Sequence, residues 1–170
     1  HKIGLMLFSD QVELLIPPAK GRMHVLRIIR ELIEFQPKSH RTNIGAALEY
    51  MFGILRKKAI VFLLSDFIDA DYSEALKVVA RKHDITGIRI FEPAEQDIPD
   101  LGLVLMRHDE TGRYQWTNTS AKAVKKSYRD QYGRRVAYFE DAFRHSGAGT
   151  ISTSTKDDYA KKLLGYFKQR

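Results

Sequence analysis

An aspartate that directly follows an apolar run is the residue of this sequence best suited to chemistry. Residues 59–65 read as a buried central strand of a parallel sheet, and Asp66 comes at its carboxyl end. Ligands of α/β proteins gather at that edge of the sheet, where a carboxylate suits a hard divalent cation. An aspartate that only caps the next loop would give the same sequence, so capping is the competing interpretation.

Thr42 offers a second oxygen ligand, in the polar loop 38–43. A doubly wound sheet collects loops at one edge, so we expect Thr42 and Asp66 to converge there. Asn43, a plausible N-cap of the next helix, and Asp69, in the loop after Asp66, are supporting loop candidates. Taken alone, Thr42 also fits an ordinary capping role.

Several kinds of catalytic site are missing from the sequence. With no cysteine there is no disulfide and no thiolate nucleophile or ligand. Phosphate loops, dinucleotide fingerprints and nucleophile elbows are missing too. We therefore assign no catalytic residue and expect a protein that is not an enzyme. The alternative enzyme, a metal-dependent phosphohydrolase, would use Asp66 with Asp69 and Asp71, and a screen of phosphate esters with magnesium would reveal it.

The excess of positive charge has two interpretations. The chain has 28 Lys and Arg against 21 Asp and Glu, a net charge of +7. These basic residues are spread along predicted helices, which indicates solvated helix faces. Nucleic-acid binding is the alternative, and it predicts affinity that falls steeply with salt. No apolar run reaches the roughly 20 residues of a membrane span, and we expect a cytoplasmic location.

Apolar strands alternate with amphipathic helices along the chain, which is typical of a mainly parallel sheet covered on both faces. A short turn at residues 9–11 predicts an antiparallel hairpin between strands 2–8 and 12–16, and Pro17 should end the second strand. A second hairpin is predicted at 103–107 and 114–117 around the turn 109–112, with Trp116 half-buried. Helices are expected near 22–36, 44–56, 72–81, 120–145 and 157–167, and the remaining strands at 84–91 and 149–153.

Short motifs along nearly the whole chain resemble one bacterial family. The chain is similar to von Willebrand factor A domains, and more closely to the family called domain of unknown function 58, which is linked to MoxR-type AAA+ ATPases. The motifs that carry the resemblance are Phe8-Ser9-Asp10, Ile16-Pro17-Pro18, Lys20-Gly21-Arg22, Ile29-Arg30-Glu31-Leu32, Ser65-Asp66-Phe67-Ile68-Asp69, Lys82-His83-Asp84 and Trp116-Thr117-Asn118-Thr119-Ser120.

The resemblance implies a fold and a role. The fold would be a doubly wound α/β sheet of order 3-2-1-4-5-6 with only strand 3 antiparallel. Residues 1–170 would be the C-terminal two-thirds of a single domain that lacks its first strand. The role would be that of a protein-interaction module, an adaptor of a MoxR-type ATPase in protein assembly or maturation.

The resemblance also implies a metal-ion-dependent adhesion site. Thr42 and Asp66 match its second and third motifs, while the first, Asp-x-Ser-x-Ser, would lie upstream of Lys2. The full-length protein would bind Mg²⁺ or Mn²⁺, whereas this fragment should bind none. Without the first strand, the strands 2–8 and 59–65 would have open edges. We expect them to pair with each other or with a second copy in a homodimer.

Overall fold

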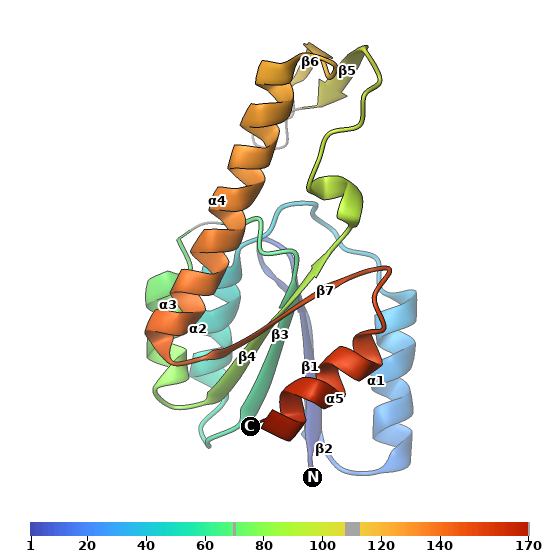
Figure 1. Ribbon diagram of the computed structural model, residues 1–170. Coiled ribbons are helices and arrows are strands. Elements are labelled where there is room, and N and C mark those ends of the chain that lie inside the picture. Colours follow the sequence, from blue (N-terminus) through green and yellow to red (C-terminus); the bar gives the residue numbers. More distant parts are fainter. Residues whose placement is uncertain (70, 108–112, 170) are drawn as a thin grey trace. The chain divides into compact units, whose positions relative to one another are not determined.

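The computed structural model describes residues 1–69, 71–107 and 113–169, and the chain divides into two compact units (Figure 1). Unit 1 comprises residues 1–61, 68–85 and 145–147, and unit 2 comprises residues 62–67, 86–144 and 148–170. Strands and helices alternate through both of them, and each unit is described by itself below.

Unit 1 begins with an antiparallel hairpin of β1 (Ile3–Phe8) and β2 (Val12–Ala19), which confirms the predicted hairpin. The prediction that Pro17 ends the second strand is wrong, because β2 runs on to Ala19, which pairs with Ile3. A strand with only one neighbour tolerates proline, since the N–H that proline lacks is not needed on the open side. The pairing register of the two strands shifts between Ile3 and Leu5 and again between Leu7 and Phe8.

Three helices complete unit 1: α1 (Arg22–Glu34), α2 (Ile44–Ile54) and α3 (Ser73–Ala80). Helices α2 and α3 pack together and bury their apolar sides. Four side chains at this core are at most 1% exposed: Ile44, Leu48, Leu76 and Val79. In α1, only Ile28 of the apolar stripe is buried, while Leu32 and Ile33 are 53% and 78% exposed. The helix predicted near 22–36 is therefore confirmed, but most of its apolar side chains are exposed in this chain.

The parallel sheet lies mostly in unit 2 and has the order β3-β4-β7, formed by β3 (Ile60–Ser65), β4 (Asp84–Phe91) and β7 (Gly149–Ser154). The prediction that residues 59–65 form a central strand is wrong, because β4 is central and β3 is an edge. Apolar residues on both faces of β3 mimic a buried strand, yet Ile60, Phe62 and Leu64 are 69%, 45% and 54% exposed.

Helices cover both faces of this sheet, as the doubly wound prediction requires. Thr86 and Gly87 are neighbours on β4, so their side chains point to opposite faces. Thr86 lies 3.4 Å from the Tyr166 hydroxyl of α5 (Tyr159–Gln169), whereas a Cβ on Gly87 would meet Phe143 of α4 (Lys122–Ser146). The α/β fold class is thus confirmed.

A cluster of three phenylalanines joins α4 to the end of β3. Phe67 lies with its ring centroid 4.4 Å from that of Phe139 and 5.5 Å from that of Phe143, and all three side chains are at most 1% exposed. Phe139 and Phe143 are two of the buried residues of α4. Gly147, with φ of 72°, ends that helix in the left-handed conformation that glycine adopts readily.

The second predicted hairpin is confirmed, with β5 (Leu103–Arg107) antiparallel to β6 (Tyr114–Asn118). The predicted turn 109–112 lies outside the described residues. The long helix predicted near 120–145 is confirmed as α4, which begins at Lys122. A short 3₁₀ turn, η1 (Pro93–Glu95), follows β4.

Strand β1 belongs to unit 1 and most of β3 belongs to unit 2, so the expected direct pairing between them stays a prediction. Each has one hydrogen-bonded neighbour among the described residues, β2 for β1 and β4 for β3. Pairing through a second copy stays a prediction. Among residues 1–69, 71–107 and 113–169, no helix has the length and apolar character needed to cross a bilayer.

Candidate functional site

The loop after β3 presents Asp66 at the carboxyl end of the strand. The Ser65 hydroxyl donates a hydrogen bond to Asp66 Oδ1 at 3.3 Å and accepts one from the Phe67 N–H at 3.1 Å. Asp66 is exposed, whereas Phe67 is 1% exposed. The carboxylate is therefore at the surface of a loop that the next side chain anchors in the core.

Phe67 occupies an uncommon backbone conformation. Its φ is 56°, in the left-handed region that bulky residues rarely adopt. Such a conformation costs of order 1–3 kcal/mol and persists only where the surroundings hold it, and it clusters at functional sites. Here the Phe139 and Phe143 rings supply the packing. The fixed loop supports Asp66 as the residue that this turn presents.

Three loops of unit 1 meet at the start of α2. Asn43 Oδ1 accepts a hydrogen bond from the Ala46 N–H at 2.9 Å, which confirms Asn43 as the N-cap. Asp69 Oδ2 accepts one from the Ile44 N–H at 2.6 Å, and the Asn43 N–H donates to the Ser9 carbonyl at 3.0 Å. Asn43 and Asp69, both loop candidates from the sequence, are thus brought together, where each satisfies the helix N-terminus.

The pair that the sequence analysis assigns to a metal is divided between the units. Thr42 is an exposed loop residue of unit 1, and Asp66 belongs to unit 2. Their convergence stays a prediction. Within the described part of the chain, no cluster of three or more His, Cys, Asp or Glu side chains could hold a metal ion. A complete site would need oxygen ligands in addition to these two.

His83, whose residue type alone could suggest chemistry, has structural contacts. It is 3% exposed, and its Nδ1 accepts a hydrogen bond from the Ala59 N–H at 3.2 Å. The ring also meets Phe52 edge-on at 6.4 Å between centroids. Burial, with the positive charge of Lys82, lowers the pKa of His83 below its ordinary 6.5. The His83 imidazole is therefore uncharged in the folded protein at neutral pH.

This burial predicts that acid destabilises the protein through His83. The unfolded chain takes up the proton near pH 6.5, whereas the folded chain resists it, so the free energy of unfolding should fall as the pH drops below about 6.5. Chemical denaturation from about pH 7.5 to about 5.5 would measure the fall. His83→Gln should flatten this dependence, and His40→Gln, at an exposed loop histidine, should leave it as it is. An unchanged slope in His83→Gln would contradict the assignment.

Arg89 is a buried charge that sequence reasoning missed. It lies on β4 and is 5% exposed, with Nη2 donating to the Tyr132 hydroxyl at 2.7 Å. Its guanidinium also lies 4.6 Å from the centroid of the Phe91 ring and 5.0 Å from that of Tyr132. The sequence feature that could have revealed this buried charge is an arginine between two isoleucines in the predicted strand 84–91. Its contacts are those of a packed cation between aromatic rings.

The fold and the Asp66 loop define an α/β protein with a fixed acidic turn at the carboxyl end of a sheet strand. The family model described as a protein of unknown function, DUF58, matches residues 1–138, and the chain belongs to this family. An uncharacterized protein of Mycobacterium bovis is 20% identical over 177 residues, covering 100% of this chain and 54% of its own length. One of Mycobacterium avium is 21% identical over 161 residues, covering 90% of this chain and 92% of its own.

Two solved structures share the fold. An aerotolerance-related membrane protein from Bacteroides fragilis has a TM-score of 0.57 at 14% identity, covering 99% of this chain and 80% of that one. The conserved hypothetical protein BatB from Bacteroides thetaiotaomicron has a TM-score of 0.55 at 13% identity, covering 99% of this chain and 78% of that one. The chain spans about half the length of the Mycobacterium bovis relative. These likenesses extend to the fold and not to a shared activity.

Proposed function

We propose that this DUF58 chain is part of a protein-interaction module and that the turn after β3 contributes to its docking site. The observation that carries the proposal is the exposed Asp66, whose carboxylate accepts a hydrogen bond from the Ser65 hydroxyl and which precedes the buried Phe67. A rigid turn presents its carboxylate without an entropic cost on binding. The role is docking rather than catalysis, and its setting is the cytoplasm.

The chemistry proposed for this turn is metal-bridged recognition. In the full-length protein, Asp66 and Thr42 would each supply oxygen ligands to Mg²⁺ or Mn²⁺, hard cations that carboxylates and hydroxyls suit. A carboxylate of the partner would complete the coordination of the ion. The partner proposed from the family resemblance is a MoxR-type AAA+ ATPase, with the pair acting in assembly or maturation of other proteins.

Asp66→Ala in the full-length protein is expected to weaken binding of the ATPase about tenfold or more, because a buried interfacial charge contact is lost. Titration calorimetry with magnesium and with chelator would measure the affinity. Folding should stay nearly intact, since a carboxylate kept for binding often costs stability. Asp130→Ala, which removes an exposed carboxylate from α4, is the matched control and should bind like the natural protein.

Two results would count against the proposal. A large fall in the unfolding temperature of Asp66→Ala, measured without metal, would assign the carboxylate to capping. Equal affinity of Asp66→Ala and Asp130→Ala for the ATPase would remove the turn from the docking site.

A further inference from the structure

One face of the β5–β6 hairpin carries four exposed apolar or aromatic side chains beside Arg107 and Asn118. Side chains alternate between the two faces of a strand, so Leu103 and Leu105 share a face of β5, and their partners in the register share it on β6. Leu105 pairs with Trp116, and Tyr114 lies on the same side. These four side chains, Leu103, Leu105, Tyr114 and Trp116, are 64%, 51%, 68% and 64% exposed and are called the hairpin patch below. The prediction that Trp116 is half-buried is wrong.

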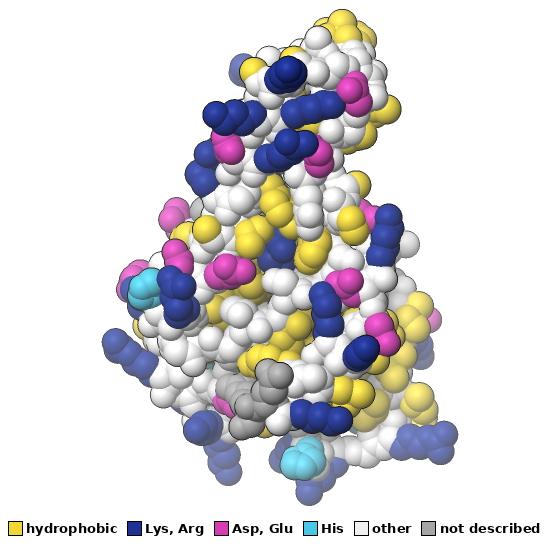
Figure 2. Space-filling view, viewed as in Figure 1, with side chains coloured by type: hydrophobic (Ala, Val, Ile, Leu, Met, Phe, Trp, Pro, Cys, Tyr) yellow, Lys and Arg dark blue, Asp and Glu magenta, His cyan; other side chains and the backbone are white. Residues whose placement is uncertain are grey.

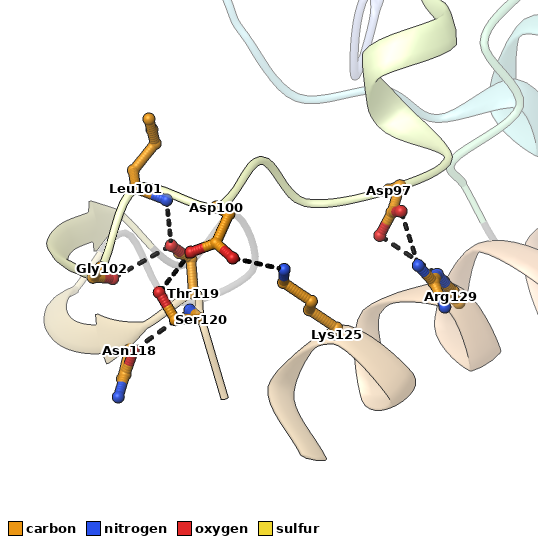
Figure 3. A network of polar contacts seen from close by, with 9 residues as sticks. All are labelled: Asp97, Asp100, Leu101, Gly102, Asn118, Thr119, Ser120, Lys125 and Arg129. Carbon is orange, nitrogen blue, oxygen red and sulfur yellow. Dashed lines mark hydrogen bonds and ion pairs between the residues drawn. The ribbon is translucent and has the colours of Figure 1, made fainter. Parts of the chain in front are cut away.

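The hairpin patch is not the result of a loose hairpin. The buried Thr119 hydroxyl donates to the Gly102 carbonyl at 3.0 Å and accepts from the Leu101 N–H at 2.9 Å, which closes the base of the hairpin (Figure 3). The other face of the strands, with Val104, Met106 and Thr117, is half-buried. A two-stranded hairpin is only marginally stable by itself, so these contacts fix the patch in place.

Two aspartates fasten the hairpin to α4, as Figure 3 shows. Asp97 forms two hydrogen bonds with the Arg129 guanidinium, at 2.6 and 3.1 Å, and Asp100 binds the Lys125 Nζ at 2.9 Å and the Ser120 hydroxyl. The Arg129 hydrogen bonds lower the pKa of Asp97, and those of Ser120 and then Lys125 lower the pKa of Asp100. Both shifts favour the ionised carboxylates, which join the loop before β5 to α4.

The sequence that contains the hairpin patch has a surplus of basic residues. Residues 97–136 hold eight Lys and Arg residues and five acidic residues, and two of the basic residues, Lys125 and Arg129, pair with Asp100 and Asp97. Lys122 and Lys126 are exposed on the first turns of α4, and Arg107 is exposed at the end of β5. Figure 2 shows apolar side chains at the hairpin end of unit 2, and Lys and Arg side chains with some Asp and Glu among them over the adjoining part of the unit. The apolar tip thus lies beside a region with a surplus of basic residues.

From these observations we infer that the hairpin patch docks on the surface of an anionic lipid bilayer. Trp, Tyr and Leu beside Lys and Arg are typical of segments that lie in the membrane interface. A second copy is disfavoured, because two regions with a basic surplus would repel each other. Trp and Tyr are also enriched at protein interfaces, so it is the exposed Lys122 and Lys126 that favour a bilayer over a protein partner, because Lys is depleted at those interfaces. Docking of this kind needs no membrane-spanning helix.

The experiment uses the purified chain with vesicles of phosphatidylcholine alone or with phosphatidylglycerol added. Trp116 is the one tryptophan of the chain, so its fluorescence reports on the patch directly. We expect a blue shift, and quenching by brominated acyl chains, with the anionic vesicles. Cosedimentation at low and high salt would give the partition coefficient, which should fall as salt screens the lipid charge.

Two variants separate the apolar and the charged contributions. Leu105→Ser should lower the partition coefficient about tenfold, because a leucine side chain no longer enters the interface. The double variant Lys122→Gln with Lys126→Gln should lower it about 30-fold, given the attraction of each lysine to an anionic surface. Ile33→Ser, at an apolar α1 residue that is 78% exposed, is the matched control and should bind like the natural chain.

Three outcomes would overturn the inference. One is an unshifted Trp116 spectrum with anionic vesicles. Another is binding that Leu105→Ser leaves intact, which would mean attraction of charges without insertion. The third is a loss in Ile33→Ser equal to that in Leu105→Ser, which would place the contact elsewhere. Circular dichroism of every variant would establish that each is folded.

Discussion

Phe143→Ala is expected to lower the free energy of unfolding by about 3–5 kcal/mol. The side chain is 0% exposed and lies between the sheet and its helix, with ring centroids 4.9 Å from Phe139 and 5.5 Å from Phe67. Removing the ring loses its transfer free energy and leaves a cavity that two neighbouring rings cannot fill without leaving their own positions. Aromatic pairs contribute further because of their edge-to-face geometry.

Denaturant unfolding followed by circular dichroism measures this loss, and the unfolding temperature should fall by roughly 10 °C. Tyr159→Ala, which truncates an aromatic side chain 66% exposed on α5, is the matched control and should change the free energy by no more than about 0.5 kcal/mol. A loss in Phe143→Ala as small as that of the control would mean that the ring is not part of a packed core. Since Phe67 anchors the Asp66 turn, the variant should also loosen that turn.

Helices and hairpins could be predicted from the sequence because their signals are local. The stripe from Tyr128 to Phe143 marks α4, and Asn43 marks the start of α2 through a hydrogen bond three residues away. The pairing of two strands in a hairpin is also a local feature, because a short connection joins them. The elements are therefore close to those predicted, although β2 continues through its prolines.

The position of a strand within a sheet could not be predicted, because it depends on partners far away in sequence. Residues 59–65 are apolar on both faces, a pattern that a central strand and an uncovered edge strand share. Pairing places β4, not β3, in the middle. The exposure of the Trp116 side chain could not be predicted for the same reason. Leu105 and Trp116 lie in strands whose alternating pattern also fits a buried hairpin face, and only the surroundings of these side chains leave them at the surface.

The candidate site was predicted in part. Asp66 does follow a sheet strand, and Asn43 and Asp69 do meet at the N-terminus of α2 through the backbone of Ile44 and Ala46. Their roles there are those of caps, which sequence spacing cannot distinguish from metal ligation because the same oxygen atoms serve both. The left-handed Phe67 had no sequence signal, since bulky residues seldom adopt that conformation.

Gly87→Ala is expected to destabilise the protein by about 1–3 kcal/mol, although the added group is a single methyl. A Cβ at this position would lie 2.5 Å from Cε1 and Cζ of Phe143 and 2.9 Å from Cε2 of Phe139. Both rings are fully buried, so they cannot swing into solvent to make room. The close approach of α4 to β4 therefore requires glycine here, whatever its effect on strand propensity.

A double-mutant cycle tests this reason directly. Phe143→Leu removes the two closest of the three ring atoms that the new methyl would meet, leaving Cε2 of Phe139, so Gly87→Ala should cost less in that background, with a coupling of about 1–2 kcal/mol. Gly133→Ala, in α4, is the matched control, because a Cβ at this position would meet nothing within 4 Å. This variant should stabilise the helix by about 0.4–1 kcal/mol. Equilibrium denaturation of all four members of the cycle gives the coupling. Additive effects of the two changes would show that Gly87 is needed for its backbone and not for the packing of α4.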